Sequence, residues 1–131
     1  MQTRLDKVRN HPLHKYLGVS KIDAKDGSAE LFAIVNEAAL NPSGNYHGGV
    51  VYMLCDVCAY CAVLSALPEG QDAVTHDIHI SVLRPALEND SLEYRASIKK
   101  LGRSLCFIDV EVKSGEHLVA TARVTKSLIG S

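Results

Sequence analysis

One carboxylate and one pair of glycines are the residues of this 131-residue chain whose types and spacing favour chemistry. Asp56 is the one charged residue in the apolar run VVYMLCDVCAYCAVLSAL, residues 50–67, and Gly48 and Gly49 stand just before that run, after His47. Backbone N–H groups without side chains around them, at the start of a helix, can polarise a carbonyl oxygen. A carboxylate and such an oxyanion site are the minimum for hydrolysing an activated acyl group such as a thioester.

Asp56 also has a purely structural interpretation. Burying an unpaired carboxylate is expensive, so the side chain must either find partners or line a cavity that retains some water. The partners could be a neighbouring strand, or Tyr52 and Tyr60 one turn away on the same helix.

The spacing between Gly48 and Asp56 predicts a site that two chains share. Eight residues of α-helix span about 12 Å, so the two residues of one chain cannot contact the same carbonyl group. If the helices of two subunits run antiparallel across a two-fold axis, the start of one helix faces the middle of the other, which gives two equivalent sites.

The elements that must position these residues are one long helix and a set of strands. Residues 50–67 predict a helix that is apolar almost all round and therefore buried inside the domain; Pro68-Glu69-Gly70 ends it. A membrane span is disfavoured because Asp56 lies well inside the run. Alternating or loosely alternating residues predict strands over 28–39, 73–83, 91–101, 104–112 and 118–129. A loop over 41–45 and an amphipathic helix over 4–17, interrupted near Pro12, complete an α+β fold with an antiparallel sheet wrapped around a central helix.

The composition predicts a single globular domain over residues 1–131. The net charge is −1, 47% of the residues are hydrophobic and 22% are charged. No stretch gathers lysines and arginines into a dense basic run, so no nucleic-acid partner is expected. No apolar stretch follows the first charged residues, so we expect no secretory signal and a cytoplasmic, reducing location.

The cysteines and two histidines allow alternative interpretations. Cys55, Cys58 and Cys61 fall on one side of the helix, which would suit a metal site, but buried cysteines more commonly serve as small hydrophobic residues. We expect no metal. His76 and His79 could contact substrate, although lone strand histidines are more often structural.

An ordered set of motifs resembles the hotdog-fold acyl-CoA thioesterases, in the group of the phenylacetate-pathway and hydroxybenzoyl-CoA thioesterases. The resemblance spans residues 36–127 and rests on Asn41, His47-Gly48-Gly49, Asp56, the strand Val74–Ile78 running to Leu83-Arg84-Pro85-Ala86, and Leu101-Gly102-Arg103-Ser104. His76 departs from it, because the family more commonly has an apolar residue there.

The resemblance implies a role for each matching residue. Asp56 would be the nucleophile or general base, and the Gly48 N–H would hold the oxyanion. Asn41 and His47 would orient the substrate or the loop, and Thr75 would position the attacking water or the carboxylate. The implied substrate-binding residues are Gly49, Arg84, Arg103 and Ser104, the last three toward the coenzyme A nucleotide. The resemblance also implies a homodimer that often pairs into a homotetramer, with coenzyme A as part of the substrate and no cofactor.

Two other functions fit the same residues. A hotdog hydratase or dehydratase would use His47 and Asp56 as an acid–base pair, and a non-catalytic module would bind acyl-CoA without cleaving it. The sequence does not define the acyl group.

Overall fold

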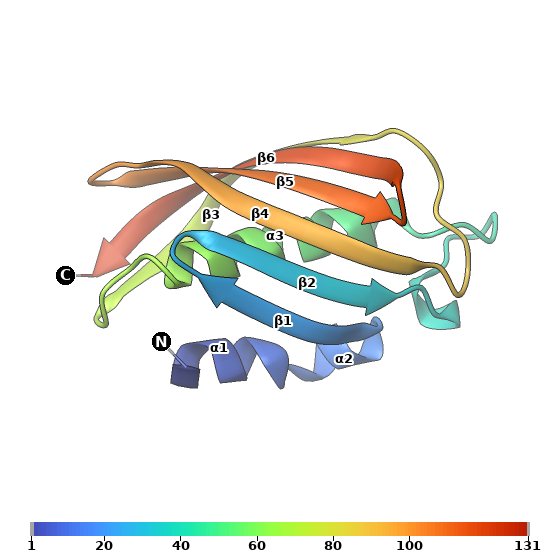
Figure 1. Cartoon of the computed structure of the whole chain (residues 1–131), viewed down its shortest axis with the longest axis horizontal. Coiled ribbons are helices and arrows are strands. Elements are labelled where there is room, and N and C mark those ends of the chain that lie inside the picture. The colour runs from blue at the N-terminus through green and yellow to red at the C-terminus, as the bar shows by residue number, and fades with distance from the viewer. Residues whose placement is uncertain (1, 131) are drawn as a thin grey trace.

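The computed structural model describes residues 2–130. Within them, the strands form one six-stranded antiparallel sheet in the order β1-β2-β4-β5-β6-β3, and the sheet curves around the helix α3 (Figure 1). The elements are α1 (Gln2–Arg9), α2 (Pro12–Tyr16), β1 (Val19–Lys25), β2 (Ser28–Ile34), the 3₁₀ helix η1 (Glu37–Ala39), α3 (Gly48–Leu64), β3 (Gln71–Val82), β4 (Ser91–Leu101), β5 (Leu105–Ser114) and β6 (His117–Gly130). The predicted fold, an antiparallel sheet wrapped around a central helix, is confirmed.

Helix α3 presents most of its surface to the concave face of the sheet. It begins at Gly48 and ends at Leu64, so the predicted range 50–67 is displaced toward the C-terminus. Ser65 is the C-cap of the helix: its hydroxyl donates to the carbonyl of Ala62 at 2.7 Å and accepts from the N–H of Gly27 at 2.8 Å. These bonds tie the end of the helix to the β1–β2 turn.

One stripe of α3 is not covered by the chain. Tyr52 is 49% exposed, and Asp56 and Tyr60 are only half-buried. The expectation of a helix buried on every side is therefore wrong along this stripe. An exposed aromatic ring beside a carboxylate, on a helix that is otherwise buried, indicates a binding surface.

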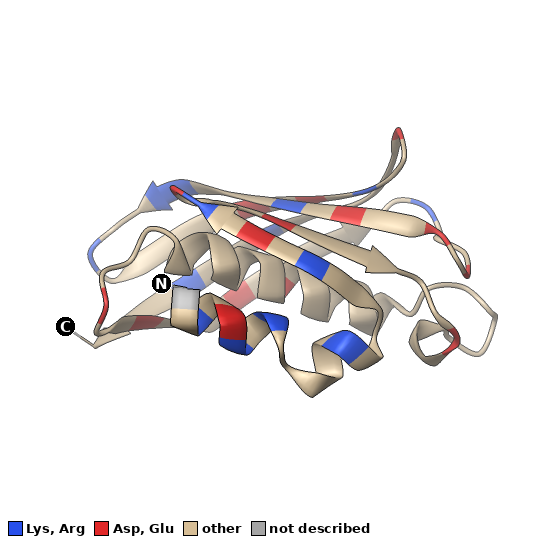
Figure 2. Cartoon of the chain, turned by 60° about the horizontal axis from the view of Figure 1, so that its bottom comes forward, with Lys and Arg blue, Asp and Glu red and all other residues tan. Residues whose placement is uncertain are grey.

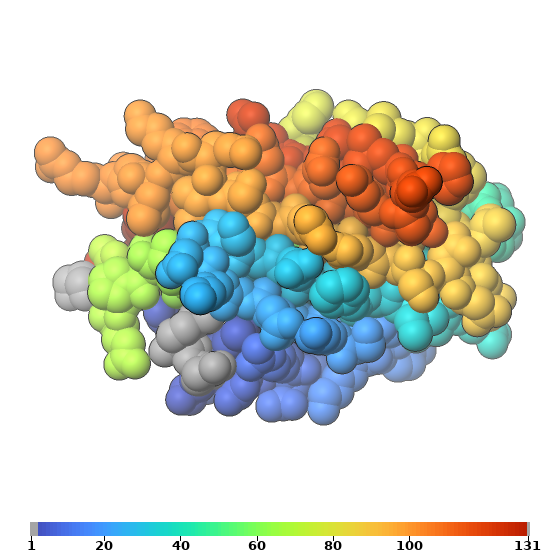
Figure 3. All heavy atoms as spheres, in the orientation of Figure 1, coloured from blue at the N-terminus to red at the C-terminus, as the bar shows by residue number. Residues whose placement is uncertain are grey.

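The N-terminal helices cover the part of α3 beside this stripe. Pro12 breaks the predicted helix into α1 and α2, as expected. Leu5 and Val8 of α1 are buried in the core, and the Arg4 guanidinium donates to the carbonyls of Leu67 and Gln71. In the space-filling view these two helices (dark blue) lie along the lower edge of the molecule, below β1 and β2 (Figure 3).

Two sequence-based expectations for the first strands are wrong. Strand β1 was not expected, because Ile22 is its only buried side chain and charged residues flank it. The segment 28–39 is not one continuous strand: β2 ends at Ile34, buries only alternate residues and is followed by η1.

Strand β3 is an edge strand with a bulge. It pairs only with β6 among the strands of the described residues, so its other edge is open. Thr75 pairs with Lys126 and Asp77 pairs with Thr125, which leaves His76 as the extra residue. Bulges of this kind redirect side chains and are common beside active sites.

Charged residues of both signs are interspersed over the chain (Figure 2). In the part of the chain that the structure describes, no helix is both long and apolar enough to cross a membrane. The cytoplasmic location stays a prediction from the sequence.

Candidate functional site

Asp56 is held in place by two polar side chains that reach it from the sheet. The Thr75 hydroxyl on β3 lies 2.7 Å from Oδ1 and 2.9 Å from Oδ2 of Asp56. The ammonium group of Lys126 on β6 lies 2.7 Å from Oδ1. Of the partners that the structural interpretation allowed, a neighbouring strand is right and the tyrosines are wrong. Tyr60 donates instead to Asp72 Oδ1 at 2.7 Å.

Lys126 is the residue of this cluster that the sequence did not point to. Its side chain is 3% exposed, whereas that of Asp56 is 34% exposed. Its ammonium also donates to Thr75 Oγ1 at 2.9 Å and lies 5.5 Å from the centre of the Tyr60 ring. Asp56, Thr75 and Lys126 therefore form a closed triangle of hydrogen bonds.

The triangle opens onto a cavity of about 530 Å³ between the N-terminal helices and the edge of the sheet. Val8, Val57 and Val74 supply apolar walls, and the ring of Tyr60 lies among them. The volume lies within the usual range for small-molecule sites. The carboxylate of Asp56 is therefore in contact with a space that can hold part of a ligand.

Three residues at the start of α3 form a second candidate cluster. His47 is the N-cap: its Nδ1 accepts from the N–H of Gly49 at 3.0 Å. The N–H groups of Val50 and Val51 bond to the carbonyl of His47. No acceptor among residues 2–130 takes up the N–H of Gly48, as expected for the first residue of a helix. The predicted oxyanion donor is thus available, while the N–H of Gly49 is already used.

Packing within the chain does not require a glycine at position 48. A Cβ added to Gly48 would meet no atom within 4 Å, and its φ is not in the left-handed region. The missing side chain instead leaves the N–H accessible to a molecule outside the chain.

Asn41 organises the loop that leads to the helix. Its Oδ1 accepts from the N–H groups of Ser43 and Asn45, both at 3.0 Å. Of the two roles expected for Asn41, orienting the loop is the one that these bonds support.

The predicted site residues fall into two groups that one chain does not bring together. Arg103 and Ser104 form the exposed β4–β5 turn, whose Ser104 carbonyl accepts from the N–H of Leu128, two residues beyond Lys126. They are therefore at the Asp56 end. Arg84 is exposed beyond the far end of β3, near Ala86, whose carbonyl accepts from the N–H of Tyr46. Arg84 is therefore at the Gly48 end, with Asn41 and His47.

The remaining candidates take structural positions. His76 Nδ1 is 3.3 Å from the hydroxyl of Ser127, and His79 lies on the outer face of the sheet. All four cysteines are free thiols and buried. Burial raises the pKa of Cys55 and of Cys61 to about 12, so these thiols stay protonated at neutral pH. Among the residues described, no cluster of three or more His, Cys, Asp or Glu side chains has a metal-binding arrangement.

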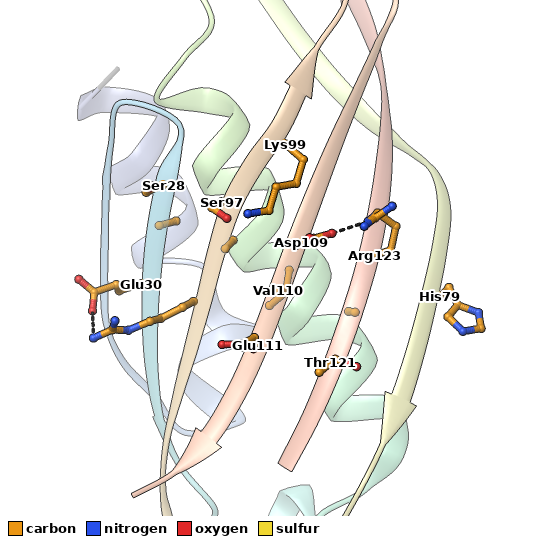
Figure 4. Close-up of a pocket in the computed structure, with 14 residues that line it drawn as sticks. Ser28, Glu30, His79, Ser97, Lys99, Asp109, Val110, Glu111, Thr121 and Arg123 are labelled. Atoms are coloured by element: carbon orange, nitrogen blue, oxygen red, sulfur yellow. Dashed lines mark hydrogen bonds and ion pairs between the residues drawn. The ribbon is translucent and has the colours of Figure 1, made fainter. Parts of the chain in front are cut away.

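A larger hollow of about 750 Å³ lies on the outer face of the sheet, away from Asp56. Figure 4 shows two ion pairs among its charged side chains, Glu30 with Arg95 and Asp109 with Arg123. Lys99 and Glu111 also line the hollow. These are surface charges rather than a convergent reactive group.

Comparisons with known proteins give the family. A model of the thioesterase superfamily matches residues 43–121, more than half of the chain. A Halobacterium salinarum protein named as an esterase is 34% identical over 94% of this chain and 83% of its own length. Human acyl-coenzyme A thioesterase 13 is 29% identical over 95% of this chain and 89% of its own length.

Solved structures agree with this result. The Escherichia coli PaaI protein of the phenylacetic acid degradation operon superposes with a TM-score of 0.88 at 27% identity, covering 99% of this chain and 93% of that one. A thioesterase from Streptococcus pneumoniae, solved with coenzyme A, has a TM-score of 0.79 at 30% identity, covering 85% and 86%. The chain belongs to the thioesterase superfamily, and its sheet wrapped around α3 is the hotdog fold.

Proposed function

We propose that this protein hydrolyses acyl-CoA thioesters to a free acid and coenzyme A, with Asp56 as the reacting carboxylate. The observation on which the proposal rests is the position of Asp56: a carboxylate on a buried helix, held by Thr75 and Lys126, that lines a cavity of about 530 Å³. Membership of the thioesterase superfamily supports the reaction, and the relatives with acyl-CoA in their names or coenzyme A in their structures support the substrate class.

The chemistry needs two groups. Asp56 takes a proton from water while the water oxygen attacks the thioester carbon, or Asp56 attacks that carbon directly and the resulting anhydride is then hydrolysed. In either case the carbonyl oxygen becomes an oxyanion that the Gly48 N–H stabilises. When the oxyanion collapses, the C–S bond breaks and the thiolate of coenzyme A leaves. That thiolate needs little acid assistance, because thiols have a pKa of about 8.5.

A second copy of the chain supplies the Gly48 N–H. Within one chain Gly48 and Asp56 are separated by about 12 Å along α3, whereas the antiparallel helix of a partner would bring its own Gly48 to Asp56. The open edge of β3 supports this arrangement, since the strand exposes Val74 and Val82 at 49% and 46% and Leu83 follows at 56%. An exposed apolar edge strand is a template for pairing with another chain. Pairing of two dimers into a tetramer stays a prediction.

The acyl group is proposed to enter the cavity beside Asp56, while the nucleotide stays at the surface near the Arg103–Ser104 turn and the partner's Arg84. In a site shared by two chains, His47 of one chain would approach Asp56 of the other together with Gly48, but the Nδ1 of His47 already accepts from the N–H of Gly49. No observation therefore favours the acid–base pair of a hydratase over hydrolysis.

The deciding experiment measures release of free thiol from a panel of aryl and aliphatic acyl-CoAs by the wild type and by Asp56→Asn. We expect turnover by the wild type, and a loss of about 10²- to 10⁴-fold in kcat by the variant with acyl-CoA binding retained. Binding without release by the wild type would instead identify an acyl-CoA-binding module, and no release from any acyl-CoA would end the proposal.

A further inference from the structure

We infer that Lys126 is a positioning residue for the hydrolysis: its ammonium group, together with the Thr75 hydroxyl, holds the Asp56 carboxylate in one orientation during the reaction. The inference rests on the proposed function, because it gives Lys126 a task in the same reaction. Its direct support is the pair of contacts from Lys126 Nζ, 2.7 Å to Asp56 Oδ1 and 2.9 Å to Thr75 Oγ1.

The hydrogen bonds of the triangle have a definite direction. An ammonium group only donates, so the Thr75 oxygen accepts from Lys126 and its single proton is directed at the Asp56 carboxylate. Lys126 and Thr75 both contact Oδ1, whereas Thr75 alone, among the described residues, contacts Oδ2 at 2.9 Å. Oδ2 therefore has more unused acceptor capacity than Oδ1.

Stability does not explain a lysine at this position. Lysine is almost never fully buried unless it is paired, and a buried ion pair can often be replaced by apolar residues without loss of stability. Val124, two residues earlier on β6, is fully buried and apolar. The position of this buried lysine, beside a carboxylate that is one-third exposed, indicates a role in the chemistry of that carboxylate.

The neighbouring tyrosine and arginine make their hydrogen bonds to groups other than Asp56. The Tyr60 ring lies 5.5 Å from the ammonium, and its hydroxyl is occupied by Asp72. The Arg4 guanidinium is bound to the carbonyls of Leu67 and Gln71. The titratable and charged groups that line the cavity, besides the triangle, are Arg4, Lys7, His11, His14, Tyr60 and Asp72. Among residues 2–130, Lys126 is the one cation that contacts Asp56.

Substrate binding makes this contact important. When an acyl group and a partner subunit displace water from the cavity, water can no longer hold the Asp56 carboxylate in place. The hydrogen bonds from Lys126 and Thr75 then fix its orientation.

The test compares the full-length wild type with Lys126→Met, an apolar side chain of similar length, and Lys126→Arg, which keeps the charge. Lys113→Met is the matched control, because Lys113 is exposed on β5. Circular dichroism first establishes that each variant is folded, and Lys126→Gln replaces Lys126→Met if that variant is not. Two quantities are then measured at neutral pH: the ¹³C chemical shift of the Asp56 carboxyl by NMR, which reports on its hydrogen bonds, and kcat for thiol release.

In Lys126→Met we expect the ¹³C chemical shift of the Asp56 carboxyl to change, because the carboxylate loses a charged hydrogen-bond donor. We expect kcat at neutral pH to fall roughly tenfold, with partial recovery in Lys126→Arg and no change in Lys113→Met. An unchanged chemical shift overturns the inference, whether or not the wild type hydrolyses acyl-CoA. A changed chemical shift with an unchanged kcat overturns the role in hydrolysis. Absence of thiol release by the wild type ends the proposed function, and it is distinguished from these outcomes by the NMR measurement.

Discussion

The N–H of Gly49 donates to the Nδ1 of His47, 3.0 Å away, and this bond separates the roles of two adjacent glycines. The N–H of Gly49 is consumed inside the chain, while that of Gly48 points outward from the first position of α3. The bond also assigns the histidine proton to Nε2 when the ring is neutral, because Nδ1 is the acceptor.

Gly48→Pro should remove the proposed oxyanion donor while leaving the helix intact. Proline is well tolerated at the first position of a helix, and His47, with φ −67° and ψ 128°, already has the extended conformation that a following proline requires. We expect kcat for acyl-CoA hydrolysis to fall about 10²- to 10³-fold with an unchanged circular dichroism spectrum. Gly48→Ala is the paired variant, since it keeps the N–H and its Cβ meets no atom of its own chain. Normal kcat in Gly48→Pro would rule out this N–H as the donor.

Mixed dimers should report whether two chains share each site. When Asp56→Asn and Gly48→Pro subunits are combined, one of the two sites receives both substitutions and the other receives neither. Each mixed dimer should therefore recover about half of the wild-type activity, although both parents are nearly inactive. The measurement is thiol release after co-refolding or co-expression of differently tagged chains. Activity no higher than that of the parents would show that the site is not shared.

His47→Ala should weaken the start of α3. Loss of a side-chain N-cap bond typically costs about 1 kcal/mol in the free energy of unfolding. We expect a decrease of that size in urea denaturation, while His79→Ala, whose side chain is exposed on the outer face of the sheet, should change little. Equal stability of the two variants would contradict the capping role.

The docking of α2 should weaken in mild acid. Burial lowers the pKa of His14, and the charge of His11 lowers it further, although a hydrogen bond to the Val8 carbonyl acts in the opposite direction. Because the folded state holds His14 less protonated than the unfolded state does, its contribution to stability is complete above about pH 6.5 and is lost as the pH falls. The protection factors against hydrogen exchange at residues 12–17, which remove the pH dependence of the intrinsic exchange rate, should therefore fall more steeply from pH 7 to pH 5 in the wild type than in His14→Gln. Identical slopes would remove His14 as the cause.

The fold was largely predictable because its strongest signal is local. The apolar run around Asp56 and the alternating strands after it define a central helix and an antiparallel sheet without any tertiary information. Strand β1 was missed because charged residues surround its one buried side chain, Ile22, so its pattern resembles a loop. The uncovered stripe of α3 was missed for a different reason: the stripe includes Tyr52 and Tyr60, whose types do not distinguish a core from an interface.

The candidate site was predictable in part. Asp56 was predicted from the cost of burying a carboxylate and from the resemblance, and Thr75 from the resemblance alone. Lys126 was not predicted, since a lysine in an alternating strand normally marks the exposed face. Only the pairing of β3 with β6 places Lys126 opposite Thr75, and that pairing joins residues 51 positions apart.

The bulge at His76 has a consequence for how this chain tolerates change. Before the bulge, Ala73 and Thr75 face α3; after it, Ile78 and Ile80 pack against the core and His79 faces outward. The inward positions thus switch from odd to even numbers at this one residue. Deleting position 76 would force the strand to give up either its contact with Asp56 or its apolar packing, whereas replacing the histidine would disturb neither. In descendants of this sequence, position 76 should therefore vary in residue type but resist deletion.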